Sequence, residues 1–224
     1  PDELHIDDPS YIDTIYAGGS NKRDKWVYYT SQFGLGDSAF GAVSHERHRM
    51  LRSAMARFFS RAAITKLERF IKQCADKLCD QLEANAGTGR PVDLAAAYSC
   101  LTTDVATEYA YARCTNYLDS PTFEPNLRAA IFGGMQAAPL IKQWPPLFDI
   151  MDAMPAWLVG AMMPAMPIYL NQIAAWRKQA EDVKAGRTGD YEKRTESEAT
   201  IFHELIHGDL PEKEKSAGRL AQEG

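Results

Sequence analysis

The chain has 224 residues, of which 45% are hydrophobic and 25% are charged. This balance is typical of a globular protein and argues against intrinsic disorder. The formal net charge is −5 at pH 7. It argues against a nucleic-acid partner, because neutralising phosphates requires lysines and arginines gathered over a whole face.

The four cysteines show no arrangement typical of a metal site or a disulfide framework. Cys74, Cys79, Cys100 and Cys114 form neither a C-x-x-C pair nor a regular spacing. We expect all four to be buried thiols, since cysteine is among the most frequently buried residue types.

The two ends of the chain indicate a fragment of a longer protein. The chain begins at Pro1 without an initiator methionine or a signal-like apolar run, and it ends in the polar stretch 220–224. We therefore interpret it as part of a larger protein.

Strand and helix signals open the chain. Residues Glu3–Ile6 predict a short strand. Asp8 followed by Pro9 predicts the cap and first turn of a short helix, which the glycines from Gly18 onward end. Residues 27–44 mix aromatic residues with glycine and serine without a helical period, so we predict a long loop, an element that often carries function.

Apolar periodicity predicts helices that begin after Ser44 and after Asp93, and others that cover residues 61–85, 124–138 and 168–185. The most sustained apolar stripe lies in the segment 61–85 and consists of Ile64, Leu67, Phe70, Ile71, Cys74, Leu78 and Leu82. A mainly helical protein is expected from this pattern.

The uncharged stretch 153–170 is just long enough for a transmembrane helix. Pro155, Pro164 and Pro167 argue against one, because an interior proline removes a backbone hydrogen bond and clashes with the preceding turn. We predict a hydrophobic loop with short helical pieces that covers a cavity or dips into a membrane surface. A buried core segment is the alternative.

The segment HERHRMLR predicts a helix with one basic face. On a helix that turns about 100° per residue, His45, His48, Arg49 and Arg52 fall within an arc of about 100°, and apolar residues lie on the opposite side. Two arginines and two imidazoles that converge suit an anion, because guanidinium donors match the geometry of a carboxylate. A solvated face that is salt-bridged elsewhere is the alternative.

A second motif has the form of a zinc site. His203, Glu204 and His207 match H-E-x-x-H, in which two histidines bind zinc and the glutamate acts as general base. Leu210 stands where the extended motif needs glycine, and no later histidine supplies a third ligand. Two histidines at polar positions of a surface helix are the other interpretation.

The order of these segments resembles the first half of a cytochrome P-450, a haem-thiolate monooxygenase, of the type found in fungal secondary metabolism. PDELHIDDPSYIDTIYAGG is similar to the opening strand and the short helix after it, and HERHRMLRSAMARFFS is similar to helix C. RPVDLAAAYSCLTTDVATEYAYA resembles helix E, and TIFHELIHGDLPEKEKSAGRLAQEG resembles helix H and the start of helix I.

This resemblance implies a mainly α fold, with helices about B to H, the start of helix I and a short N-terminal β element. Residues 1–224 would form one partial domain, truncated before the oxygen-activating and haem-thiolate motifs. Neither A/G-G-x-x-T nor the cysteine loop of the family occurs. The axial thiolate would therefore lie outside this chain, and no residue of the chain is expected to be catalytic.

The resemblance also implies site residues. Helix C of the family carries a Trp-x-x-x-Arg motif that contacts a haem propionate. Arg52 matches the arginine and His48 occupies the tryptophan position, so these two residues are expected to hold haem. Phe33, Phe40 and Phe132 are candidates to line the substrate pocket, with core packing as the alternative for each.

As a complete protein, such a family member would insert one oxygen atom from O₂ into a lipophilic small molecule, with electrons from an NADPH-dependent reductase. The fragment itself would be inactive. The H-E-x-x-H match would be accidental. Residues 153–170 would cover the substrate channel and touch the endoplasmic reticulum membrane from its cytosolic face, with the N-terminal anchor outside this chain. A zinc metallopeptidase using His203, Glu204 and His207, and a non-enzymatic helical binding domain, remain as alternatives.

Overall fold

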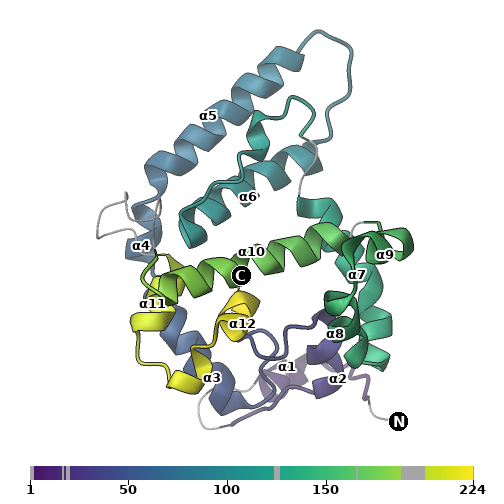
Figure 1. Ribbon diagram of the computed structural model, residues 1–224, viewed down its shortest axis with the longest axis vertical. Helices are drawn as coiled ribbons and strands as arrows, with labels where there is room; N and C mark the ends of the chain where they lie inside the picture. The colour runs from purple at the N-terminus through teal and green to yellow at the C-terminus, as the bar shows by residue number, and fades with distance from the viewer. Residues whose placement is uncertain are drawn as a thin grey trace.

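The computed structural model describes residues 3–16, 18, 21–123, 127–164, 166–187 and 200–223. Within these residues the regular structure is helical and includes no strand. Figure 1 shows α10 (Met166–Lys184) crossing the middle of the molecule, with the hairpin of α5 (Glu68–Asn85) and α6 (Leu94–Tyr111) extending to one side. The expected mainly α fold is confirmed.

The other helices lie around α10, with α11 near one of its ends and α7 and α9 near the other (Figure 1). They are α1 (Ile12–Ile15), α2 (Val27–Thr30), α3 (His45–Ala56), α4 (Arg61–Thr65), α7 (Leu127–Gln143), α8 (Pro146–Ala153), α9 (Ala156–Met162), α11 (Ile201–His207) and α12 (Ala217–Leu220). Short 3₁₀ helices are η1 (Pro9–Tyr11), η2 (Ser31–Phe33), η3 (Tyr117–Asp119), η5 (Glu212–Glu214) and η6 (Ala221–Glu223).

The expected strand at Glu3–Ile6 is wrong, because residues 3–8 have no regular secondary structure and are exposed. A strand needs a partner strand for its backbone hydrogen bonds, and no other described residue forms one. The cap that follows is confirmed: the Asp8 carboxylate accepts a hydrogen bond from the backbone N–H of Ser10 at 2.9 Å, and Pro9 begins η1.

The long loop expected over residues 27–44 is only partly confirmed, since its first part forms α2 and η2. Aromatic rings one turn apart stabilise this part, with the centroids of Trp26 and Tyr29 separated by 5.4 Å. The ammonium of Lys142 on α7 lies 4.2 Å from the centroid of the Tyr29 ring. This contact between distant segments is the kind that local sequence periodicity does not contain.

Side-chain caps fix the start of the central helices as expected. The Ser44 hydroxyl accepts from the backbone N–H of Arg47 at 3.5 Å, and the Asp93 carboxylate accepts from the N–H of Ala96 at 3.0 Å. The single helix expected over residues 61–85 is instead divided into α4 and α5. At the break the N–H of Lys66 bonds to the carbonyl of Ala63, which tightens the last turn of α4.

The cysteines differ in burial, so the expectation of four buried thiols is wrong for two of them. Cys74 and Cys100 are buried, Cys114 is half-buried and Cys79 is exposed, and all four are free thiols. Cys74 and Leu78 are one turn apart on the face of α5 that packs against α6, whereas Cys79 lies about 100° further around the helix. Only the first of these faces enters the core.

The segment of residues 153–170 contains the short helix α9, as expected, but its last residues begin the 19-residue helix α10. Pro155 caps α9, and α10 begins after Pro164. None of the described helices has both the length and the apolar character needed to cross a membrane. Val159 and Met166 are buried in a small core with α7 and α8, so part of this segment is core. Trp157 is nevertheless 74% exposed.

Candidate functional site

A cluster of cationic side chains lies at the N-terminal half of α3. We call Lys25, His45, His48 and Arg52 the cationic cluster. Neither the His48 ring nor the Arg52 guanidinium has a hydrogen-bond or ion-pair partner among the described residues. Burial lowers the pKa of His48, and the positive charges of Lys25, Arg52 and His45 lower it further. No acidic side chain among the described residues therefore forms an ion pair with His48 or Arg52.

Arg47, on another face of α3, has the opposite surroundings. Its guanidinium contacts the carboxylate of Glu214 at 3.1 Å and that of Asp37 at 3.1 Å. These acids raise the pKa of Arg47, against the effect of burial. Arg47 is not a residue of the expected basic face, and at His48 and Arg52 of that face the described residues form no salt bridge.

The cationic cluster fits a carboxylate-bearing cofactor. Guanidinium and protonated imidazole groups donate to carboxylate oxygens, and a charge-assisted hydrogen bond of this kind is stronger than a neutral one. His48 is half-buried and Arg52 is exposed, so an anion can reach both from the surface of this chain. The haem propionates named by the resemblance have the required charge.

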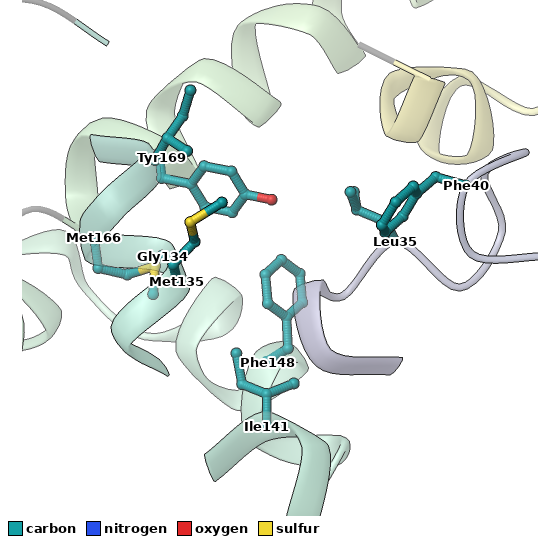
Figure 2. A pocket seen from close by; sticks show the side chains of 9 residues that line it. Leu35, Phe40, Gly134, Met135, Ile141, Phe148, Met166 and Tyr169 are labelled. Atoms are coloured by element: carbon teal, nitrogen blue, oxygen red, sulfur yellow. The ribbon is translucent and has the colours of Figure 1, made fainter. Parts of the chain in front are cut away.

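An apolar cavity of about 260 Å³ lies beside the loop of residues 35–41, which we call the pocket loop. It is lined by Leu35, Phe40, Ile131, Gly134, Met135, Ile141, Phe148, Met166 and Tyr169. Figure 2 shows Leu35 and Phe40 on one side of this space and Met135 and Tyr169 on the other, with Phe148 between them. None of the described residues that line the cavity is charged, so these walls suit an uncharged, lipophilic molecule.

The three expected aromatic residues have different positions. Phe40 lines the cavity. Phe132 is exposed on α7 and does not line it; the guanidinium of Arg128 lies over its ring, 5.1 Å from the centroid. Phe33 lies in η2, and its side chain is outside the described part of the structure.

The cavity residues on α7 share one helical face that sequence reasoning missed. Ile131, Gly134 and Met135 follow at three- and four-residue steps, whereas Phe132 lies about 100° away from Ile131. A Cβ atom at Gly134 would meet the ring of Tyr169 at 3.9 Å, an ordinary contact distance. The apolar period of the expected helix 124–138 is the signal that identifies this face.

A glycine allows the loop before the cavity to approach α8. Gly34 has a φ of 67°, in the left-handed region, and a Cβ atom there would collide with the Phe148 ring. Phe148 therefore packs directly against the backbone of Gly34 and closes the cavity at this point. A single glycine in an aromatic-rich segment does not reveal this contact by its sequence alone.

Lys25 joins the cationic cluster to the cavity. Its ammonium donates to the backbone carbonyl of Phe40 at 2.6 Å and to that of Ala39 at 3.3 Å. The same residue contributes positive charge near His48. Sequence analysis missed Lys25 because it precedes the helix that carries the other cations and has no periodic relation to them.

Comparison with known proteins identifies the protein family. The sequence model described as cytochrome P450 matches residues 6–207. The chain belongs to the cytochrome P-450 family.

Curated relatives are fungal cytochrome P-450 monooxygenases. The whole chain is 38% identical to a monooxygenase of Macrophomina phaseolina and covers 66% of it. It is 37% identical to one of Cochliobolus heterostrophus, of which it covers 42%. It is 31% identical to a tryptophan 6-hydroxylase of Fusarium equiseti, of which it covers 44%. The chain thus spans roughly half the length of these cytochrome P-450 relatives.

The H-E-x-x-H segment of this cytochrome P-450 chain lies on α11. Its two imidazole rings stack with centroids 6.4 Å apart, but Nδ1 of His203 lies 2.8 Å from the hydroxyl oxygen of Thr200. The carboxylate of Glu204 pairs with Arg57 at 3.3 Å. The described residues contain no group of three or more His, Cys, Asp and Glu side chains placed to hold a metal ion. Two side chains of the motif, His203 and Glu204, thus contact other side chains of the protein.

Proposed function

We propose that the complete protein to which this chain belongs is a haem-dependent monooxygenase that inserts one oxygen atom from O₂ into a lipophilic small molecule of fungal secondary metabolism. Family membership and the monooxygenase relatives support the reaction class. The observation in the structure that carries the proposal is the cationic cluster, in which His48 and Arg52 have no described partner beside an apolar cavity. Bound haem would supply the oxygen chemistry.

His48 and Arg52 hold a propionate carboxylate of haem in this proposal. The guanidinium of Arg52 would donate hydrogen bonds to that carboxylate, and the negative charge would favour protonated His48, against the burial and neighbouring cations that lower the pKa of His48. No catalytic residue is assigned within the chain. The axial thiolate belongs to a segment outside it, and the chain alone is inactive.

The substrate cavity is formed by the pocket loop and by α7, α8 and α10. Phe40 contacts the substrate and Phe33 stays as a further candidate, whereas Phe132 does not line this cavity. Burial raises the pKa of Tyr169, so its hydroxyl stays protonated at neutral pH. A cavity without charged walls selects an uncharged molecule, because an ion would lose its hydration without gaining a partner.

An NADPH-dependent reductase supplies the electrons, and the region of α9 contacts the cytosolic face of the endoplasmic reticulum membrane. Trp157 is 74% exposed and Met162 is 70% exposed on α9. Tryptophan favours the boundary between lipid and water. The matched test compares vesicle sedimentation of the complete protein with its Trp157→Ser/Met162→Ser variant; equal binding would exclude this contact.

The experiment for the main proposal measures the haem content of the purified complete protein and the absorbance of its reduced carbon monoxide complex. One haem per chain with a Soret maximum typical of thiolate ligation is the expected result. A complete protein without haem would overturn the proposal and favour a helical binding domain. Stoichiometric zinc that is lost on His203→Ala would instead establish the metallopeptidase alternative.

A further inference from the structure

The pocket loop is held through its backbone by side chains that follow it by more than 180 residues. The backbone N–H of Asp37 donates to Oε1 of Gln222 at 2.8 Å. The N–H of Ala39 donates to both carboxylate oxygens of Glu223 at 3.1 Å. These contacts lie between Leu35 and Phe40, the two residues by which the loop lines the cavity.

Cations hold the carbonyl groups of the same loop. Nε of Arg219 donates to the carbonyl of Asp37 at 3.3 Å. The ammonium of Lys25 donates to the carbonyl of Phe40 at 2.6 Å. The pocket loop has no helix or strand of its own, so charged and polar side chains from other segments satisfy its backbone groups.

Behind the loop Glu214, Arg219 and Glu223 form a buried ion cluster, which Arg47 extends toward the more exposed carboxylate of Asp37. The Arg219 and Glu223 side chains are each 4% exposed and form an ion pair, and Glu214 is 9% exposed. Glu214 also lies 3.6 Å from Arg219. Buried ion pairs contribute little net stability, but they fix geometry because each charge needs its partner.

The pocket loop is internally connected, so a displacement at one point moves both ends. The Ser38 hydroxyl donates to the carbonyl of Leu35 at 2.7 Å and accepts from the N–H of Gly41 at 3.0 Å. A Cβ atom at Gly41 would collide with the Leu35 carbonyl, so the two ends of the loop are in close contact. Leu35 and Phe40 therefore move together.

From these contacts we infer that Arg219 and Glu223 are positioning residues that set the shape of the cavity by holding the pocket loop in place. Neither residue lines the cavity; their side chains instead hold the backbone of Asp37 and Ala39, between Leu35 and Phe40. The link to substrate selection rests on the proposed function, since it takes the cavity as the substrate site.

The first experiment measures amide hydrogen exchange of a peptide that covers residues 35–41 in the complete protein. Glu223→Ala removes the acceptor for the Ala39 amide, and Gln222→Ala removes the acceptor for the Asp37 amide without changing any charge. We expect exchange to be about 3- to 10-fold faster in both variants, the effect of losing one hydrogen bond. Glu223→Gln keeps an acceptor and should show the smaller change. Glu212→Ala is the matched control, because its side chain is 83% exposed.

The second experiment titrates the haem absorbance of the same variants with imidazole and with 1-hexyl- and 1-dodecylimidazole. All three bind haem iron through the same nitrogen, and only the alkyl chains test the apolar walls. In Glu223→Ala we expect affinity for the two alkylimidazoles to fall about 3- to 10-fold, with the affinity for imidazole and the haem content unchanged.

Two outcomes overturn the inference. Unchanged exchange of residues 35–41 in Glu223→Ala and Gln222→Ala would show that these contacts do not hold the loop. Faster exchange with unchanged alkylimidazole affinity would show that the loop does not shape the cavity. A complete protein that binds no haem contradicts the proposed function instead, and the exchange measurement still tests the positioning role separately.

Discussion

Two faces of α3 carry the same kind of residue in opposite surroundings. Arg47 lies against Asp37 and Glu214, with its positive charge compensated on both sides. Arg52 is exposed, with no described acidic partner, and its positive charge lowers the pKa of His48. An arginine that is paired with carboxylates of its own chain stabilises the fold, whereas one without such partners is available to bind an external anion. The presence or absence of acidic partners therefore distinguishes a structural arginine from an anion-binding one.

The largest effect on stability is expected when the ion pairs of Arg219 are removed. Arg219→Ala leaves the buried carboxylate of Glu223 without its ion-pair partner, and Glu214 loses one of two. Removing one partner of a buried ion pair costs about 3 to 5 kcal/mol. Urea unfolding of the complete protein measures this loss. A loss no larger than that of an exposed ion pair, about 0 to 1 kcal/mol, would contradict the description of this cluster as buried and compensated.

The next prediction concerns Arg52, which has no described acidic partner. Arg52→Ala should lower haem retention about tenfold, the effect of losing a hydrogen bond between charged groups, with little change in the free energy of unfolding of the apoprotein. Arg49→Ala is the matched control on the same helix, since Arg49 is exposed and does not occupy the motif position. Haem titration of the two apoproteins measures the difference. Equal haem affinity in both would remove the role assigned to Arg52.

A smaller effect is expected from pH. In the folded chain the pKa of His48 lies below its ordinary value of 6.5, because of burial and the charges of Lys25, Arg52 and His45. As the pH falls, the unfolded chain therefore takes up this proton first, and the folded state loses stability between the ordinary pKa and the lowered one. His48→Gln removes this loss.

Thermal unfolding of the apoprotein from pH 7 to pH 5 measures that difference. The wild-type protein should lose more stability than His48→Gln over this range. Bound haem should reduce the loss, since a propionate favours the protonated imidazole. Identical pH profiles of the wild-type protein and His48→Gln would show that burial and the neighbouring cations do not lower the pKa of His48.

The smallest effect on stability is expected from an exposed ion pair of α3. Glu46 pairs with Lys22 at 2.5 Å, but both side chains are mostly exposed. Solvent and salt screen such a pair, so Glu46→Gln should leave the unfolding midpoint within experimental error. A loss comparable with that of Arg219→Ala would mean that exposure does not separate the two classes of ion pair.

Local chemistry made much of this fold predictable. Ser44 and Asp93 cap helices because their side-chain oxygens reach N–H groups three residues later, which involves only neighbours in the sequence. The basic face of α3 likewise follows from helical spacing. Pro155 and Pro164 lie at the helix boundaries of residues 153–170, because proline lacks a backbone N–H and its ring clashes with the preceding turn.

The features that the sequence did not reveal depend on contacts between distant segments. Lys25 reaches the carbonyl of Phe40, and Arg47 meets Glu214 across 167 positions of the chain. Glu3–Ile6 has strand-like residues, but no described segment pairs with it. Phe132 has an aromatic side chain suited to a pocket, yet the face of α7 that meets the cavity carries Ile131 and Met135.

The long separation between the pocket loop and its acceptors also sets an order of events during synthesis. The hydrogen bond from the Asp37 amide to Gln222 cannot form until the ribosome has added Gln222, 185 residues later. At about 5 to 20 residues per second, the loop spends roughly 10 to 40 seconds in the nascent chain before this contact can close. α3 and α5 can form from local contacts during that interval. The cavity thus takes its final shape only after Gln222 and Glu223 have been synthesised.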